Sequence, residues 1–190
     1  MSQSELPTAL NLPPMEPLPE ATQKYFDICQ EKLGMVPNVL RTYAFDIEKL
    51  NSFTAMYNDL MLADSGLSKL EREMIAVVVS SINKCFYCLT AHGAAVRELS
   101  GDPELGELMV MNYKAARLDA RQRAMLDFAE KITKESSATG EEDRQALRDV
   151  GFSDRDIFDI ASVTGFFNMT NRVASAADMR PNPEYHAQFR

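Results

Sequence analysis

Two cysteines and a histidine stand at a spacing that suits thiol chemistry. Residues 85–88 form a C-x-x-C motif, and His92 follows four residues after its second cysteine. At about 100° per residue, a helix that begins near Cys85 places the side chains of Cys85, Cys88 and His92 at about 0°, 300° and 340° around its axis. The spacing therefore predicts that two thiols and an imidazole lie on one face of one helix.

The predicted face is apolar. It continues through Leu89, Val96 and Leu99, whereas Arg97 and Glu98 fall on other sides of the helix. An apolar face of a helix is the one that packs inward. We therefore expect the three groups to point together into a mostly apolar pocket.

This arrangement favours reversible dithiol chemistry. A helix N-terminus stabilises a thiolate at Cys85, because its partial positive charge and free N–H groups favour the anion. His92 lies one helical turn after Cys88, where it can accept a proton from that thiol or pair with its thiolate. Two thiols three residues apart can also close a disulfide, which thiol exchange reopens.

A carboxylate is expected to orient the histidine. Glu73 stands at the start of the preceding apolar helix and is the candidate that would hold the tautomer of His92. Glu71 is the competitor. The pattern Ser68-Lys69-Leu70-Glu71 is a capping box, however, and this already assigns the Glu71 side chain to the helix start.

Two structural alternatives remain for these residues. A single inward histidine is commonly a satisfied core residue, and a C-x-x-C pair is half of a zinc site. Zinc would need a second ligand pair, and beyond the motif only Cys29, His92 and His186 are available. Cys29 lies on a predicted apolar helix face and His186 in a polar tail, so we predict no metal site.

The segments around the motif are predicted to be helical. After the cap at Ser68, the stretch from Met74 to Asn83 carries no charge, so its helix should be buried nearly all round. Further helices are expected from about Ala21 to Leu33, Ile47 to Leu62, Asp119 to about Ile132, Glu141 to Asp149, and Asp154 to about Ala177. No alternating strand pattern occurs, which predicts an all-α fold.

The first twenty residues differ from the rest. Residues 1–20 hold five of the nine prolines, which predicts an extended N-terminal arm rather than a helix. The arm is either a disordered tail or a strap on the body or on a neighbouring subunit. The remaining residues 21–190 are expected to form a single all-helical domain, with the site on the hairpin 68–100.

One faint internal repeat is present. Ser68, Glu71, Ile75 and Asn83 recur 85 residues later as Ser153, Asp156, Ile160 and Asn168. A duplicated helix hairpin would produce this pattern, although four matches also arise by chance.

Composition excludes several classes of protein. The 190 residues carry a formal charge of −8 and a pI near 4.8, with no basic cluster, which argues against nucleic-acid binding. No signal peptide or span of about 20 apolar residues is visible, so we expect a cytoplasmic protein that has no membrane contact. No Gly-rich phosphate loop follows a strand, and no cofactor is expected.

The site residues resemble a known family. Glu73, Cys85, Cys88 and His92 match the Glu, Cys-x-x-Cys, His motif of the alkylhydroperoxidase-D-like branch of the carboxymuconolactone decarboxylase superfamily. The segments 34–38, 171–174 and 180–182 look like its "peroxidase-related" subgroup. The resemblance covers most of residues 20–190. It implies an all-α alkylhydroperoxidase-D-like helical bundle that assembles as a homo-oligomer.

The resemblance also implies an activity. In that scheme the dithiol reduces a small hydroperoxide: the second cysteine attacks, the first resolves, and a Glu–His relay moves the proton. Electrons would come from a lipoyl-bearing or thioredoxin-like protein. This sequence departs at Tyr87, where the best-studied relatives carry a histidine, so one relay group is missing or replaced by a phenol. The decarboxylase branch uses no cysteine pair, so that activity is not expected.

The leading hypothesis is therefore a thiol-dependent peroxidase that has Cys88 as the attacking thiol, Cys85 as the resolving thiol, and His92 with Glu73 as the proton relay. Helix-end electrostatics alone would favour Cys85 as the lower-pKa thiol. Two alternatives stay open: a dithiol-disulfide oxidoreductase that does not act on peroxide, and a helical assembly module whose thiols are not catalytic.

Overall fold

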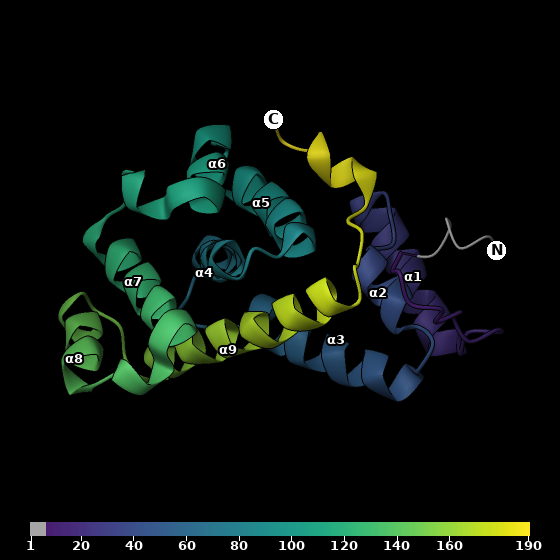
Figure 1. The fold of residues 1–190 in the computed structure, drawn as a ribbon, viewed down its shortest axis with the longest axis horizontal. Helices are drawn as coiled ribbons and strands as arrows, with labels where there is room; N and C mark the ends of the chain where they lie inside the picture. The colour runs from purple at the N-terminus through teal and green to yellow at the C-terminus, as the bar shows by residue number, and fades with distance from the viewer. Residues whose placement is uncertain (1–6) are drawn as a thin grey trace.

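The computed structural model describes residues 7–190, and within that range it contains helices and no strands (Figure 1). The α-helices are α1 (Glu20–Leu33), α2 (Asn38–Tyr43), α3 (Ile47–Leu62), α4 (Lys69–Asn83), α5 (Phe86–Ser100), α6 (Pro103–Asn112), α7 (Ala120–Glu135), α8 (Glu141–Asp149) and α9 (Asp154–Ala176). Short 3₁₀ turns include η4 (Pro183–His186) in the C-terminal tail. The all-α prediction is confirmed.

Helix α4 is the central element of the bundle. It packs against α5, α6, α7 and α9, and Figure 1 shows it end-on inside the ring that they form. Its start is the predicted capping box: Glu71 N–H donates to Ser68 Oγ at 3.1 Å, and Ser68 N–H donates to Glu71 Oε2 at 2.7 Å. Every residue from Glu71 to Ser80 is buried, which confirms the predicted burial from Met74 to Ser80, whereas Ser81 to Asn83 are half-buried.

The faint sequence repeat has a structural counterpart. Helix α9 also begins with a capping box, formed by Ser153 and Asp156. At the other end of the repeat, Asn83 Nδ2 donates to Asn168 Oδ1 at 3.0 Å. The two matched helices therefore pack against each other, and their equivalent asparagines meet.

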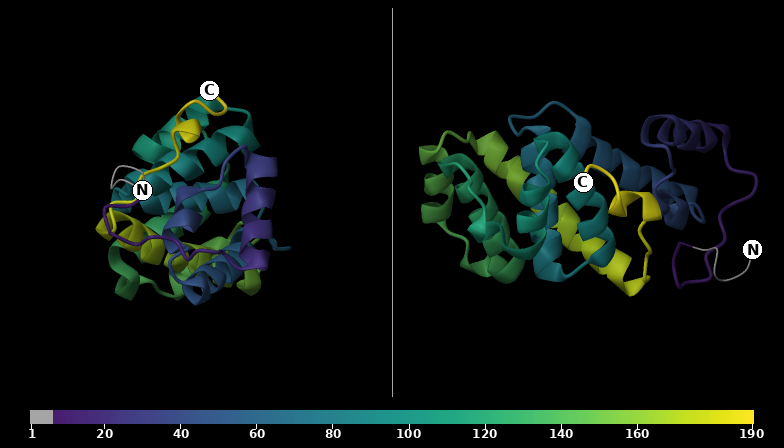
Figure 2. Two further views of the ribbon diagram at one scale, coloured as in Figure 1. Left: turned by 90° about the vertical axis from the view of Figure 1, so that its right-hand side faces the viewer. Right: turned by 90° about the horizontal axis from the view of Figure 1, so that it is seen from above.

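The N-terminal arm and helices α1–α3 lie at the opposite end of the molecule from α7 and α8 (Figure 2). In residues 7–19 the backbone contacts the body at three places: Arg180 N–H donates to the Pro7 carbonyl at 2.9 Å, Ala9 N–H donates to the Ala177 carbonyl at 3.0 Å, and Met15 N–H donates to the Ala44 carbonyl at 2.9 Å. The described part of the arm therefore lies along the body. The arm's first six residues fall outside the described range.

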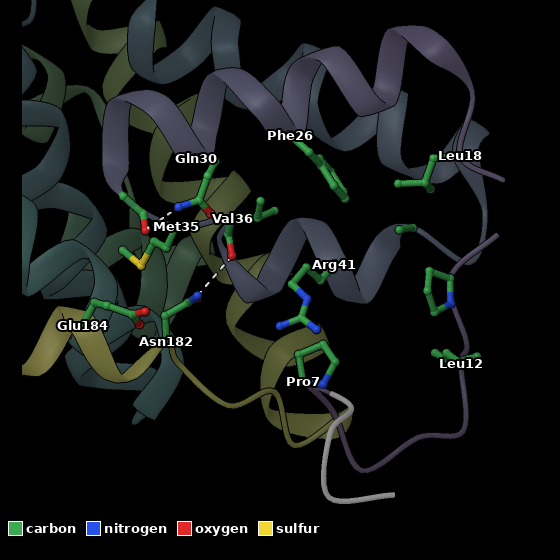
Figure 3. Close-up of a pocket in the computed structure, with 13 residues that line it drawn as sticks. Pro7, Leu12, Leu18, Phe26, Gln30, Met35, Val36, Arg41, Asn182 and Glu184 are labelled. Carbon is green, nitrogen blue, oxygen red and sulfur yellow. Dashed lines mark hydrogen bonds between the residues drawn. The ribbon is translucent and has the colours of Figure 1, made fainter. Parts of the chain in front are cut away.

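The arm, α1, α2 and the C-terminal tail enclose a cavity of about 560 Å³, the arm cavity (Figure 3). The tail is fixed there by Asn182, whose Nδ2 donates to the Val36 carbonyl at 3.0 Å and whose Oδ1 accepts from Asn38 N–H at 2.7 Å. Arg41 is the one cation in the lining, and its guanidinium meets only Asn38 Oδ1, at 3.4 Å, among the described residues.

Two helices, α2 and α6, were not predicted. Helix α2 begins at Asn38, directly after Pro37, and has only six residues and no side-chain cap. Helix α6 is capped by Asp102 and has Pro103 in its first turn, which are ordinary start signals. No helix within residues 7–190 is both long and apolar enough to cross a membrane.

Candidate active site

The two cysteines meet at the start of α5. Helix α5 begins at Phe86, one residue later than a helix that includes Cys85 would, so Cys85 is the N-cap residue. Its Sγ accepts a hydrogen bond from Cys88 N–H at 3.4 Å, and the two Sγ atoms are 2.9 Å apart. Both are free thiols and are buried, with 1% and 4% of their surface exposed.

The contact between the sulfurs makes the two thiols unequal. The hydrogen bond from the Cys88 thiol lowers the pKa of Cys85 to about 7, and the backbone N–H of Cys88 and the nearby His92 act in the same direction. The same contact, together with burial, raises the pKa of Cys88. In the singly ionised pair the thiolate therefore resides on Cys85, and Cys88 carries the shared proton.

His92 and Glu73 form the second half of the site. His92 Nδ1 lies 2.7 Å from Glu73 Oε2, and both side chains are largely buried. When the Nδ1–H of His92 donates to the carboxylate, the other ring nitrogen can accept a proton and later return it. The edge of Phe167 packs on the imidazole, with ring centroids 4.7 Å apart, which fixes the ring plane.

Glu73 is therefore the carboxylate that reaches the histidine, as the sequence predicted. Glu71 is occupied elsewhere: besides its place in the capping box, its Oε1 accepts from Arg121 Nε at 2.9 Å. The two acids are two residues apart on α4, and this separation turns them toward different sides of the helix.

The predicted apolar face of α5 is correct in its first turns and wrong in its last. Val96 is fully buried, but Leu99 is 42% exposed. Arg97, expected on another side, is buried with 6% exposed, because Nε and Nη2 donate to the carbonyls of Gln188 and Tyr185 in the C-terminal tail. The tail covers the end of α5, which a pattern local to the helix could not reveal.

A cavity of about 540 Å³, the dithiol cavity, opens beside these groups. Cys88, His92 and Glu73 line it, whereas Cys85 is not among its lining residues. The rest of the wall is mostly apolar and aromatic, from α1, α2, α3, α9 and the tail, and includes Leu40, Phe53, Tyr57, Phe166, Met179 and Tyr185. Cys88 thus faces the open space, and Cys85 lies behind it.

Three polar residues beside the sulfurs were missed in the sequence. Hydrogen bonds from Asn171 and Ser80 to the Cys88 sulfur lower its pKa, although burial and the contact with Cys85 raise it by more. A hydrogen bond from Ser175 lowers the pKa of Cys85 in the same way. Asn171 is itself held in place, since its Nδ2 donates to Ser80 Oγ at 2.9 Å and its Oδ1 accepts from Asn83 at 3.0 Å. An asparagine inside the apolar stretch of α9 was the available signal.

Tyr87 does not stand in for a second relay histidine. Its hydroxyl accepts a hydrogen bond from Val39 N–H in α2 at 2.9 Å, and burial raises its pKa well above the ordinary range. Tyr87 is therefore a neutral phenol that ties α5 to α2. Its ring forms part of the cavity wall.

The remaining candidate ligands lie apart from the motif. Cys29 is buried on α1 and is one of the residues that line the dithiol cavity. His186 is exposed on η4, with its ring centroid 6.0 Å from that of Phe86. Within residues 7–190, no three or more His, Cys, Asp and Glu side chains are grouped so that they could hold a metal ion.

Comparison with known proteins places this geometry in a family. A sequence model described as the carboxymuconolactone decarboxylase family matches residues 48–131, which span α3 to most of α7 and include the whole site. A comparison with curated proteins finds no match.

Solved structures give the same placement. The chain is 76% identical to an uncharacterized peroxidase-related protein from Silicibacter sp. TM1040, with a TM-score of 0.95 over 97% of this chain and 96% of that one. It is 42% identical to an uncharacterized peroxidase-related protein from Ralstonia eutropha JMP134, described as an alkylhydroperoxidase AhpD core, with a TM-score of 0.92 over 96% of each chain.

A more distant likeness, 25% identical with a TM-score of 0.65, is to a protein of unknown function from Agrobacterium tumefaciens and covers 73% of this chain and 93% of that one. The two closer likenesses extend over nearly the whole length of both partners. This chain therefore belongs to the carboxymuconolactone decarboxylase family, in its alkylhydroperoxidase-D-like, peroxidase-related subgroup.

Proposed function

We propose that this protein is a thiol-dependent peroxidase that reduces hydroperoxides with the Cys85–Cys88 dithiol. One observation carries the proposal: Cys88 and the His92–Glu73 pair face the same cavity, while the Cys85 sulfur lies 2.9 Å behind Cys88. An attacking thiol, a proton relay and a resolving thiol are thus arranged in one place. Membership of the peroxidase-related subgroup supports the same reading.

The reaction balances with these groups alone. The Cys88 thiolate attacks one peroxide oxygen, the O–O bond breaks, and Cys88 becomes a sulfenic acid while the other oxygen leaves as an alkoxide. His92, oriented by Glu73, takes up the proton that the dithiol loses when it ionises, and delivers that proton to the alkoxide, which becomes an alcohol. Cys85 then attacks the sulfenic sulfur, which forms a disulfide and releases water.

Access and ionisation point to different cysteines, and we assign the attack to Cys88. The thiolate resides mainly on Cys85, but Cys88 is the sulfur that the cavity reaches. A proton that crosses the short S···S contact moves the negative charge to Cys88 at the moment of attack. The lower pKa of Cys85 thus supplies an anionic pair, and the cavity selects which member reacts.

Burial of the dithiol also bears on the reductant. With 1% and 4% of their surfaces exposed, the sulfurs of a Cys85–Cys88 disulfide are reached only through the cavity. A slender dithiol, such as a lipoyl group on a carrier protein, fits that route better than a folded thioredoxin-like partner. We also propose that the protein assembles as a homo-oligomer, as the family resemblance implies.

Anaerobic mixing of the reduced protein with a hydroperoxide tests the activity. We expect two thiols to disappear for each peroxide consumed, with a disulfide between Cys85 and Cys88 in the peptide map. A parallel reaction with an aromatic disulfide in place of peroxide separates the alternatives. Rapid thiol loss with the disulfide and none with any peroxide would identify a dithiol-disulfide oxidoreductase instead.

A further inference from the structure

The tyrosines of this chain gather around the dithiol cavity. Five of the six line it: Tyr25, Tyr43, Tyr57, Tyr87 and Tyr185. A tyrosine has an apolar ring and a polar tip, and a buried tip normally finds a hydrogen-bond partner. The use of each hydroxyl therefore shows which of them remain available to a bound molecule.

Three of the five have an evident structural role. The Tyr87 hydroxyl accepts from Val39 N–H. The Tyr25 hydroxyl lies beside the amide of Asn58, which acts on its pKa as a hydrogen-bond partner. The Tyr43 ring stacks on Phe53, with centroids 4.7 Å apart and planes 14° from parallel, and forms a piece of wall.

Tyr57 and Tyr185 differ from these three in their position, because the charge of Glu73 acts on both of them and on none of the other three. Among residues 7–190, no protein group makes a hydrogen bond within 3.5 Å to the hydroxyl of Tyr57 or Tyr185, and the same is true of Tyr43. Tyr57 comes from α3, and Tyr185 comes from the tail that Arg97 holds against α5. Two elements distant in the sequence therefore bring two free phenols to one cavity.

Both phenols lie within electrostatic range of the relay carboxylate. Burial is the main cause of a raised pKa at each, and Glu73 is the next: the pKa of Tyr57 lies well above the ordinary range, and that of Tyr185 is raised to about 12. Both therefore stay protonated at neutral pH, so each has an O–H to donate. Glu73 is already engaged with His92, which leaves these donors for another acceptor.

We propose that Tyr57 and Tyr185 are further catalytic residues that donate hydrogen bonds to the oxygens of the bound peroxide. The inference rests on the proposed function, because the acceptor is the substrate of that reaction. When the O–O bond breaks, negative charge develops on the leaving oxygen, and a donor already aimed at that oxygen lowers the barrier. His92 then supplies the proton, and the phenols keep theirs.

Replacing Tyr57 with phenylalanine removes one donor oxygen and keeps the ring. We expect Tyr57→Phe to slow oxidation of the dithiol by cumene hydroperoxide by about 10²-fold, as loss of a single oxyanion donor does elsewhere. Tyr185→Phe should give a smaller loss, because its hydroxyl is carried by a tail segment. Tyr43→Phe removes a hydroxyl from the same wall and should change the rate far less.

Alkylation by iodoacetamide distinguishes catalysis from altered packing. The leaving group in that reaction is iodide, so Tyr57→Phe should alkylate at the wild-type rate while it reacts slowly with peroxide. A wild-type peroxide rate in both Tyr57→Phe and Tyr185→Phe would overturn the inference, and so would an equal loss in peroxide reduction and alkylation. A wild-type protein inert toward all peroxides would instead overturn the proposed function, and this inference with it.

Discussion

The dithiol cavity and the arm cavity are nearly equal in volume, at about 540 and 560 Å³, but their walls differ in kind. In the arm cavity the buried polar side chain, Asn182, is satisfied by the protein at both ends of its amide. In the dithiol cavity the wall includes a thiol bonded to a second thiol, and a histidine bonded to a carboxylate. Coupled titratable groups, more than cavity volume, mark the reactive site.

Among substitutions in the two cavity walls, replacement of the attacking cysteine should have the largest effect on peroxide reduction. Cys88→Ser should abolish peroxide consumption, because the only thiol on the cavity side of the pair is lost. Cys85→Ser should still consume one peroxide and stop at a sulfenic acid on Cys88, which a dimedone-type probe traps and mass spectrometry locates. A sulfenic acid found on Cys85 in the Cys88→Ser protein, and none in Cys85→Ser, would reverse the two roles.

The relay carboxylate should have the next largest effect. Glu73→Gln keeps the shape of the side chain but removes the charge that orients His92, so we expect dithiol oxidation to slow by about 10²-fold. Stopped-flow rates with a single hydroperoxide measure this loss.

Glu71→Gln is the matched control on the same helix. It weakens the capping box and the contact with Arg121, so it should lower the free energy of unfolding by about 1 kcal/mol and leave the oxidation rate unchanged. An equal kinetic loss in both variants would mean that helix stability, and not the relay, limits the reaction.

The pH dependence should separate the two thiols. The hydrogen bond from Cys88 lowers the pKa of Cys85 to about 7. The Cys85 thiolate should therefore form, and the rate of alkylation should increase, as the pH rises through about 7. Cys88→Ala removes that donor, so the pKa of Cys85 should rise and its alkylation should begin at higher pH. Thiolate absorbance during a pH titration measures both transitions, and an unshifted Cys85 in Cys88→Ala would contradict the assigned cause.

The sequence allowed prediction of the site where the signals are local. The cap at Ser68, the uncharged face of α4, and the spacing of Cys85, Cys88 and His92 each lie within a few helical turns. Glu73 was also predictable, because Glu71 was already assigned to the cap. The all-α fold follows from the same helical periods.

The features that were missed or wrong depend on contacts distant in the sequence. Arg97 is buried because the tail covers it, and the tail residue that it contacts lies 88 residues further along the chain. Asn171 likewise reaches the dithiol from α9. The sequence left open that the Tyr87 phenol replaces a relay histidine, but the Tyr87 hydroxyl accepts a hydrogen bond from a backbone N–H of α2. Helix α2 itself is too short for a period to show. The residues that react were thus predictable, while the residues that surround them were not.

The smallest effect is expected in the arm cavity. Arg41→Ala removes a guanidinium whose one contact among the described residues is a 3.4 Å bond to Asn38, so unfolding should change by less than about 0.5 kcal/mol and peroxide reduction should stay at the wild-type rate. Thermal unfolding and stopped-flow kinetics on one preparation measure both. A clear kinetic loss would show that the two cavities are coupled. Helix α2 would then connect the two cavities. Val39 lies two residues before Arg41 on α2, and its N–H donates to the hydroxyl of Tyr87, which stands between Cys85 and Cys88 in the sequence.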